Sequence, residues 1–326
     1  MCRADPRVSS TTPKTACPAS SAGLGLHNET CDEGPPHAAH NPATGEDKTM
    51  KYGIAIRNMG PQSNPATFRA CGRIAEDAGF DALFVSDHLC IPPDQTEGSG
   101  GRYLDVLAAL AYLAGMTNRI RIGVSVLVLP YRPAVLTAKQ IATIQELSGE
   151  RMILGVGVGW MRPEFEALGV DIRKRGAITT ETLRVLHHLF ENRDALAYRG
   201  ELVRFPAFVF EPHPKRPPIW IGGGSSKAID RVVKFGDGWH PMERPAELKP
   251  MVEDLRSRMR AAGRPDPEIV VRRALKLDDI SAARARLDTE RDAGATYFIL
   301  DLGRYSDETE FGRAAEIFMG KIADRK

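Results

Sequence analysis

The sequence predicts an α/β protein folded as a closed (β/α)8 barrel, the TIM barrel. From Met50 onward, eight short runs of β-branched or apolar residues alternate with longer stretches of helical periodicity. This alternation is typical of a parallel sheet covered by helices. It occupies about 277 residues, close to the roughly 250 residues of a typical barrel of this kind. An open, doubly wound sheet is the alternative.

Each barrel unit is expected to contribute one strand and one helix. The helices expected at 65–78 and 133–147 each begin at a proline, which suits the first turn of a helix. The segment 192–217 interrupts the rhythm and is expected to be an insertion with a hairpin. The long segment 87–103 follows the second strand and is a candidate lid, because barrel chemistry lies on the loops after the strands. The expected strands are residues 52–57, 82–86, 120–128, 152–156, 218–221, 238–240, 269–273 and 296–300.

Residues 1–49 differ in composition from the rest of the chain. They contain six prolines, no aromatic residue and four large apolar side chains, too few to offset the entropy of ordering. We expect a disordered N-terminal extension over residues 1–49 followed by one barrel domain over residues 50–326. Met50 directly precedes a strand-like run, so the favoured alternative is that the native chain starts there.

Charge and hydropathy exclude several function classes. Lys and Arg exceed Asp and Glu by only two, so no basic field favours a nucleic-acid partner. No run approaches the roughly 18 apolar residues of a membrane span. Cys2, Cys17 and Cys31 lack the close pairs of a zinc site, so no metal is expected. We expect a soluble, cytoplasmic protein acting on a small-molecule substrate.

Two glycine-rich segments follow expected strands. The sequence contains no GxxxxGK[ST], HExxH or GxSxG motif. Gly157, Val158 and Gly159 end the fourth strand, where residues without side chains let a flat ring approach the backbone or allow tight packing. Residues 222–224 are three glycines that precede Ser225 and a helix, a combination that favours phosphate binding.

Polar side chains at the end of the second strand are candidates for chemistry. Alternation places Ser86 and His88 on one face and Asp87 on the other. His88 is a candidate for proton transfer or for hydrogen bonding to a reducible ring, with a structural role as the alternative. Asp87 is a second catalytic candidate or orients a loop. In the third strand, small Ser125 indicates a bulge against a planar ligand or an ordinary buried strand.

Together these segments resemble the luciferase-like superfamily of flavin and deazaflavin oxidoreductases, and within it the coenzyme F420-dependent members. The resemblance covers residues 50 to about 320. The segments that carry it are Gly79-Phe80-Asp81, Ser86-Asp87-His88, residues 122–130, Ser148-Gly149-Glu150-Arg151, residues 155–160, Glu164-Phe165, Gly222-Gly223-Gly224 and Gly236-Asp237-Gly238-Trp239.

The resemblance implies a ring bound over the mouth of a luciferase-like barrel and a cis peptide bond at Ser125-Val126 that supports it. It also implies that Gly157, Val158 and Gly159 pass near the cofactor, that residues 222–225 lie near its phosphate, and that the protein is a homodimer. His88 matches a histidine that contacts the reacting centre in F420-dependent sugar-phosphate dehydrogenases. Those enzymes carry a carboxylate where this sequence has Trp160, which argues against the same substrate.

The expected reaction is hydride transfer between C5 of F420 and an organic substrate, with His88 exchanging the accompanying proton. The alternative is an FMNH2-dependent monooxygenase that uses O2, and a less favoured one is a flavin-binding protein without turnover. The Ser-Asp-His segment and the glycine run favour F420 over FMN. Trp160 and Trp239 are expected to line a partly apolar substrate pocket.

Overall fold

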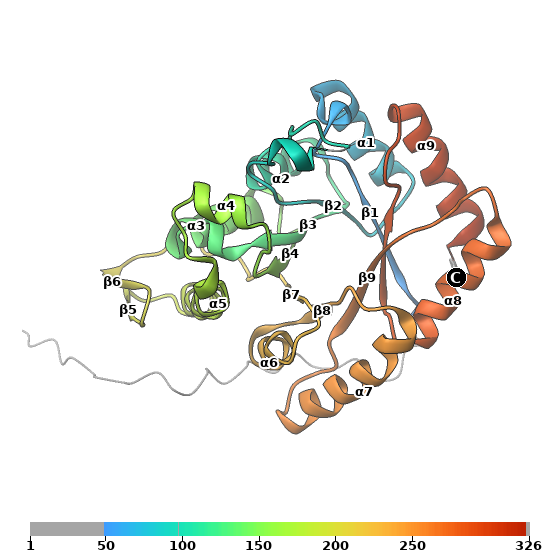
Figure 1. Cartoon of the computed structure of the whole chain (residues 1–326). Coiled ribbons are helices and arrows are strands. Elements are labelled where there is room, and N and C mark those ends of the chain that lie inside the picture. Colours follow the sequence, from blue (N-terminus) through green and yellow to red (C-terminus); the bar gives the residue numbers. More distant parts are fainter. Residues whose placement is uncertain (1–48, 97, 324–326) are drawn as a thin grey trace, which may run out of the picture. The chain divides into compact units, whose positions relative to one another are not determined.

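The chain forms a closed barrel of eight parallel strands. The computed structural model describes residues 49–96 and 98–323; the extension expected at 1–49 lies, except for its last residue, outside them. The strands surround the barrel in the order β1-β10-β9-β8-β7-β4-β3-β2 (Figure 1). They are β1 Lys51–Ala55, β2 Ala82–Val85, β3 Arg121–Val128, β4 Met152–Gly157, β7 Ile219–Gly222, β8 Gly238–His240, β9 Glu268–Ala274 and β10 Tyr297–Asp301.

Every strand expected from the sequence is present, which confirms the closed barrel. The helices lie outside the strands (Figure 1) and several begin at side-chain caps, such as Asn64 before α1 and Ser225 before α6. Their bounds are α1 Pro65–Asp77, α2 Val106–Met116, α3 Ala134–Leu147, α4 Arg162–Ala167, α5 Arg175–Glu191, α6 Ser226–Phe235, α7 Pro245–Ala261, α8 Ile280–Asp292 and α9 Glu308–Ile317.

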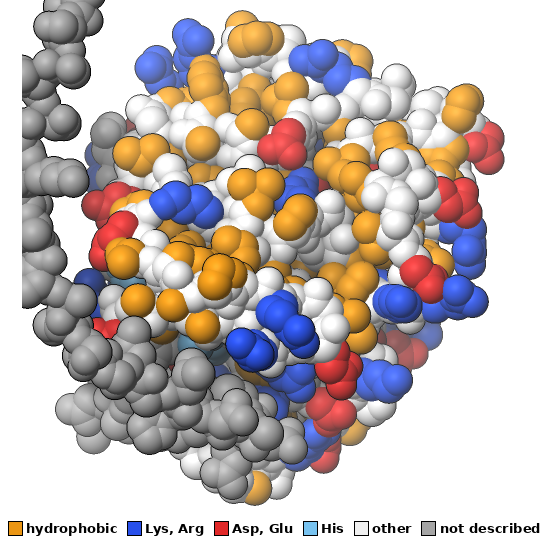
Figure 2. All heavy atoms as spheres, turned by 90° about the vertical axis from the view of Figure 1, so that its left-hand side faces the viewer, with side chains coloured by type: hydrophobic (Ala, Val, Ile, Leu, Met, Phe, Trp, Pro, Cys, Tyr) orange, Lys and Arg blue, Asp and Glu red, His pale blue; other side chains and the backbone are white. Residues whose placement is uncertain are grey.

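The expected hairpin insertion is confirmed as β5 Leu196–Arg199 paired antiparallel with β6 Arg204–Phe208. On the side of the molecule that carries this hairpin, hydrophobic side chains are interspersed with charged ones (Figure 2). Apolar side chains scattered over a surface are normal and do not by themselves mark an interface. The homodimer therefore stays a prediction. Within the described residues, no helix is both long and apolar enough to cross a membrane.

Aromatic side chains fill the barrel below its mouth. The rings of Phe84 and Trp220 stack at 5.5 Å between centroids, and Trp220 meets Tyr297 edge-on at 4.9 Å. Two neighbouring strands make room for Phe84: a Cβ atom at Gly53 would lie 2.6 Å from its ring, and one at Gly123 2.4 Å. The interior is thus solid at this level, and a ligand can approach only from the mouth, where the strands end.

The segment after β2, expected to be a lid, is attached to the barrel rim at two points. Tyr103 forms an isolated antiparallel bridge with Met59, and Arg57 Nη2 donates to the Gly98 carbonyl at 2.6 Å. The segment contains a 3-10 turn, Pro93–Gln95. Lid movement stays a prediction.

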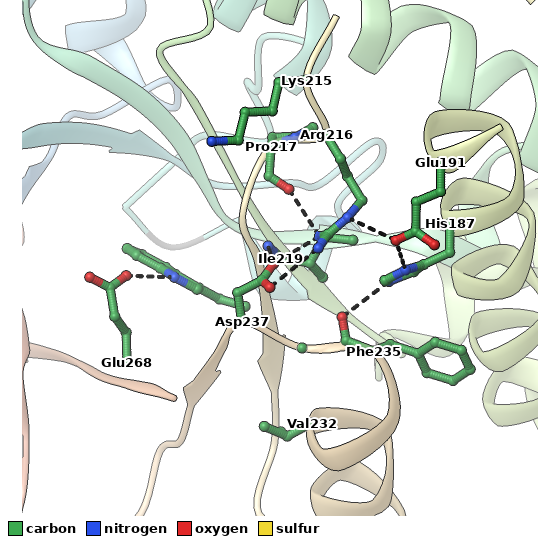
Figure 3. Close-up of polar contacts among 12 residues, drawn as sticks. His187, Glu191, Lys215, Arg216, Pro217, Ile219, Val232, Phe235, Asp237 and Glu268 are labelled. Atoms are coloured by element: carbon green, nitrogen blue, oxygen red, sulfur yellow. Dashed lines mark hydrogen bonds and ion pairs between the residues drawn. The ribbon is translucent and has the colours of Figure 1, made fainter. Parts of the chain in front are cut away.

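At the opposite end of the barrel, Asp237 anchors the starts of β7 and β8 (Figure 3). Its carboxylate accepts hydrogen bonds of 2.8 Å from Arg216 Nη1 and from the Ile219 backbone N–H. Arg264 adds a second guanidinium at 4.0 Å, and Arg216 also approaches Glu191 at 3.6 Å. Burial raises the pKa of Asp237, but the hydrogen bonds and positive charge outweigh this effect and hold the pKa below its ordinary value.

His187 belongs to the same network, while the sequence assigned it no role. Its Nδ1 lies 2.7 Å from Glu191 and its Nε2 lies 3.1 Å from the Phe235 carbonyl oxygen (Figure 3). These contacts join α5 to the end of α6 and are consistent with a structural function, since the bottom of such barrels serves stability.

Replacing Asp237 should destabilise the barrel. Asp237→Asn removes the charge that holds Arg216, so the free energy of unfolding at pH 7 should fall by about 2 kcal/mol. Because the folded pKa lies below the unfolded one, this contribution is complete above the unfolded pKa and is lost as pH falls toward the folded pKa. Urea unfolding followed by circular dichroism between pH 3 and 7 measures both effects. Asp278→Asn, an exposed substitution, is the matched control; equal stability of the two variants at pH 7 would contradict the structural role.

Candidate active site at the barrel mouth

His88 lies just beyond β2 and forms a pair with Glu164 of α4. Its Nδ1 is 3.1 Å from Glu164 Oε2, and the His88 side chain is 22% exposed, whereas that of Glu164 is wholly buried. Tyr131 O–H donates to the same carboxylate oxygen at 2.7 Å. The backbone N–H groups of Leu89 and Cys90 donate to Oε1 at 2.5 and 3.3 Å. The carboxylate therefore holds both the imidazole and the backbone that follows it.

The donors around Glu164 favour its ionised form, and the ionised carboxylate fixes the tautomer of His88. Burial raises the pKa of the Glu164 carboxyl, but hydrogen bonds from His88, Tyr131 and the Leu89 N–H outweigh burial and lower it below the ordinary value. An ionised carboxylate only accepts hydrogen bonds, so Nδ1 of His88 carries the proton. In the neutral imidazole, Nε2 then has the free lone pair. This is the arrangement of an oriented general base.

Aromatic rings surround His88. Tyr103 lies edge-on at 5.1 Å between ring centroids, and Trp160 lies edge-on at 6.2 Å. The Trp160 side chain is 69% exposed, so its place beside the candidate base agrees with the expectation that it lines a substrate pocket. Trp239 is different. It is fully buried and donates from Nε1 to the Gly223 carbonyl at 2.8 Å, so it supports the glycine loop and does not line an open pocket.

Asp87 and His88 have different partners, in agreement with the opposite faces expected from the sequence. The buried Asp87 carboxylate makes two hydrogen bonds to Arg132, of 2.7 and 2.9 Å, and accepts a third from the Val128 N–H at 2.9 Å. All these partners belong to β3 or to the segment after it. Asp87 thus ties β2 to the end of β3, which fits the loop-orienting role and leaves no open position for proton transfer to a substrate.

The middle of β3 carries the expected irregularity. The Ser125-Val126 peptide bond is cis, and the pairing with β4 shifts register between Val124 and Leu127. Ser125 Oγ lies 2.8 Å from His240 Nε2. Burial, followed by the charges of nearby arginines, lowers the pKa of His240 to about 3, so this imidazole is neutral at physiological pH.

Arg272 of β9 completes the polar floor of the mouth. Its Nη1 donates to Ser86 Oγ at 3.0 Å and to the Ser125 carbonyl at 3.2 Å, while its Nε donates to Asp301 at 2.9 Å. One guanidinium therefore connects β2, β3 and β10 directly beneath the site. Nothing in the sequence around Arg272 indicated that its side chain contacts three other strands.

The glycines at the end of β4 and just after it have a packing function. A Cβ atom at Gly157 would lie 2.7 Å from the Val126 side chain, and one at Gly159 would lie 2.5 Å from Val128. Gly159 also has a φ of 74°, which other residues rarely adopt. These glycines therefore leave room for the side chains of β3. This agrees with the alternative that the sequence left open, tight packing in the barrel. Val158 between them is partly exposed and stays a candidate for cofactor contact.

The loop after β7 has the backbone geometry expected of an anion cradle, and phosphate binding there stays a prediction. Gly223 has a φ of 102°, and Ser225 caps α6 by accepting from the Ala228 N–H at 3.3 Å. The first turn of a helix presents N–H groups that have no partner within the helix. A Cβ atom at Gly224 would overlap the Glu243 carboxylate. The Glu243 carboxylate therefore lies beside the position where a phosphate is expected.

The sequence indicated no role for Glu164 or Tyr131. Glu164 appeared only as part of a resembling segment, four residues after Trp160, and its spacing from His88 gave no indication of contact. The sequence has Trp160 where the resemblance to sugar-phosphate dehydrogenases implies a carboxylate. The fold nevertheless places a carboxylate beside His88, because Glu164 of α4 contacts the imidazole.

Comparison with known proteins gives a family match and several similar proteins. The family model described as luciferase-like monooxygenase matches residues 49–319. A relative from Mycobacterium tuberculosis, named only as an uncharacterized protein, is 30% identical over 237 residues, covering 68% of this chain and 83% of its own length. The FMNH(2)-dependent dimethylsulfone monooxygenase of Pseudomonas fluorescens is 29% identical over 199 residues, 59% of this chain and 52% of its own length.

Solved structures agree on the fold. An F420-dependent secondary alcohol dehydrogenase in complex with an F420-acetone adduct superimposes with a TM-score of 0.72 at 16% sequence identity, covering 85% of this chain and all of that chain. At this identity the likeness concerns the barrel alone. Similar proteins thus include both FMN-dependent and F420-dependent enzymes.

Removing the Glu243 charge should tighten cofactor binding. FMN and F420 both carry a phosphate, and a carboxylate beside the cradle opposes it. We expect Glu243→Gln to lower the Kd of whichever of the two the protein binds more tightly by about 3- to 10-fold. Fluorescence titration measures the Kd, with Glu316→Gln, an exposed substitution on α9, as control. An unchanged or higher Kd in Glu243→Gln alone would show that Glu243 does not oppose the phosphate.

Proposed function

We propose that this chain, which belongs to the luciferase-like monooxygenase family, uses coenzyme F420 to transfer a hydride to or from a small organic substrate. Membership makes it a flavin- or deazaflavin-dependent oxidoreductase. The observation that carries the choice of reaction is the His88–Glu164 pair, whose Nδ1 contact of 3.1 Å leaves Nε2 available at the mouth. A hydride transfer to or from a C–O or C–N bond also moves a proton, and a base oriented in this way can exchange it.

The residues that would hold the cofactor are the ones around the floor and the cradle. Ser125, Val126 and Val158 are partly exposed at the mouth, and residues 222–225 offer the phosphate position. When bound, the deazaflavin supplies a two-electron hydride acceptor or donor at its C5. Arg272 and His240 hold the floor beneath it through Ser125.

The remaining tasks fall to the chain's own residues. Glu164 fixes the His88 tautomer, and His88 Nε2 takes a proton from the substrate during oxidation or returns one during reduction. Tyr103 and Trp160 flank the imidazole and offer apolar surfaces against which a substrate can pack. Asp87 and Arg132 keep β2 and β3 in register, so the base and the floor stay at a fixed separation.

A second function has a specific observation in its favour. The Pseudomonas relative named as an FMNH(2)-dependent monooxygenase covers 59% of this chain. An FMNH2-dependent monooxygenase would place a reduced flavin over the same floor and use O2. The two functions differ in the cofactor that the barrel mouth binds.

Cofactor titration distinguishes them. We expect oxidised F420 to bind with a Kd of about micromolar order, near −8 kcal/mol, and FMN to bind at least about ten times more weakly. Fluorescence and absorbance follow both titrations. The reverse preference would replace the proposal with the monooxygenase.

The role of His88 has its own test. His88→Ala should lower turnover of F420 with a substrate found by screening by about 10²-fold or more, because the proton then lacks its acceptor. The Kd for F420 should stay within a few-fold, since His88 does not form the floor. His188→Ala, on α5, is the control and should keep wild-type turnover. Wild-type turnover in His88→Ala would remove His88 from the mechanism.

A further inference from the structure

Tyr131 and His88 contact the same carboxylate oxygen. Tyr131 ends the 3-10 turn Leu129–Tyr131, which follows β3, and its hydroxyl donates to Glu164 Oε2 at 2.7 Å. His88 Nδ1 lies 3.1 Å from that oxygen. A phenol and an imidazole therefore share one acceptor, and the phenol makes the shorter contact.

The Tyr131 side chain is fixed in place and keeps its proton. Its ring is buried, packs edge-on against Phe165 at 5.0 Å between ring centroids, and belongs to an apolar cluster with Val128. Burial, followed by the hydrogen bond to Glu164, raises the pKa of the Tyr131 phenol far above its ordinary value. The hydroxyl is therefore a permanent donor to the carboxylate at physiological pH.

Tyr131 and its neighbour Arg132 together hold the two residues that follow β2. Arg132 binds the Asp87 carboxylate directly, at 2.7 and 2.9 Å. Tyr131 reaches His88 through Glu164. Because the Tyr131 side chain is buried, it acts on the imidazole through the carboxylate and is a positioning residue.

The phenol weakens the attraction between the Glu164 charge and a proton on His88. A hydrogen bond to Oε2 disperses part of the negative charge that faces Nδ1. The carboxylate then stabilises the imidazolium, relative to the neutral ring, less than a carboxylate without this donor. The imidazole consequently stays neutral, with Nε2 open to accept a proton, down to a lower pH.

We propose that Tyr131 controls the pH at which His88 becomes a base: by donating to Glu164 Oε2, its hydroxyl lets the imidazole lose the Nε2 proton at a lower pH. This inference rests on the proposed function, which makes His88 the base. The substitution Tyr131→Phe removes the hydroxyl and alters no charge. Further ionisable side chains near this group of residues are Asp87, Cys90, Tyr103, Arg132, Arg57 and Arg272.

Titration of His88 in the purified full chain tests the proposal. Nitrogen-15 NMR of histidine-labelled protein, with His88 assigned by comparison with His88→Gln, gives the pH at which half of the rings are protonated. We expect Tyr131→Phe to raise this midpoint by about 0.5 pH unit or more, which corresponds to an approximately threefold higher proton affinity. Tyr112→Phe, on α2, removes a hydroxyl that contacts the exposed Arg69 and should titrate as the wild type does. An unchanged or lower midpoint in Tyr131→Phe would overturn the proposal.

A double-mutant cycle separates an effect through Glu164 from a change in packing. In Glu164→Gln the carboxylate charge is absent, so adding Tyr131→Phe should shift the midpoint by less than about 0.2 pH unit. An equal shift in both backgrounds would show that Tyr131 does not act through Glu164 and would overturn the proposal.

A second substitution keeps the hydrogen bond and changes its strength. Phenylalanine retains the ring that packs on Phe165, and circular dichroism shows whether Tyr131→Phe is folded. Incorporation of 3-fluorotyrosine at position 131 provides a stronger donor of nearly the same shape, so it should lower the His88 midpoint. A higher or unchanged midpoint would contradict the proposal, whether or not Tyr131→Phe folds.

The consequence for the reaction is measured separately, on protein loaded with F420. The pH at which substrate oxidation reaches half of its maximal rate should rise in Tyr131→Phe by the same amount as the NMR midpoint. A rate profile that does not follow this midpoint would remove His88 as the base and overturn the proposal. If F420 does not bind the wild type, the proposed function fails, while the NMR titration still decides whether Tyr131 controls the protonation of His88.

Discussion

The Glu164 carboxylate is the constraint on which the candidate active site depends. It is wholly buried, and it accepts from an imidazole, a phenol and two backbone N–H groups. A buried charge is tolerated only with such compensation. The same contacts fix the loop after β2 and orient His88. Structure and chemistry are therefore coupled here: a change that neutralises Glu164 alters both the loop and the base.

The floor of the barrel mouth and the loop after β7 form different parts of the candidate site. Aromatic packing below closes the interior, and Arg272 and Ser125 form a polar floor above it. The loop after β7 leads into the N-terminus of α6, and the Glu243 carboxylate lies beside its Gly224. In the proposed arrangement, the Glu243 charge lowers the affinity of this loop for a cofactor phosphate.

The sequence predicted the barrel because strands buried on both faces form short apolar runs at regular spacing. Even β8, which has only three residues, was among the expected strands. The Ser125-Val126 cis bond followed from the resemblance and was confirmed. Glu164 could not be predicted, since its contact with His88 joins residues 76 positions apart and depends on how α4 packs. The expectation that Trp239 lines the substrate pocket was wrong, since its side chain is fully buried. The alternation of residues along a strand does not distinguish a side chain packed inside the protein from one at the open mouth. Arg272 lay inside an otherwise ordinary strand.

The geometry of the site requires Glu164 to hold His88 with its proton on Nδ1. Nitrogen-15 NMR of protein labelled at histidine, with His88 assigned by comparison with His88→Gln, reports the tautomer of the neutral ring. We expect the Nδ1–H form in the wild type and its loss in Glu164→Gln, because the amide can donate where the carboxylate only accepts. An Nε2–H form in the wild type, or a tautomer that Glu164→Gln leaves unchanged, would show that Glu164 does not orient His88.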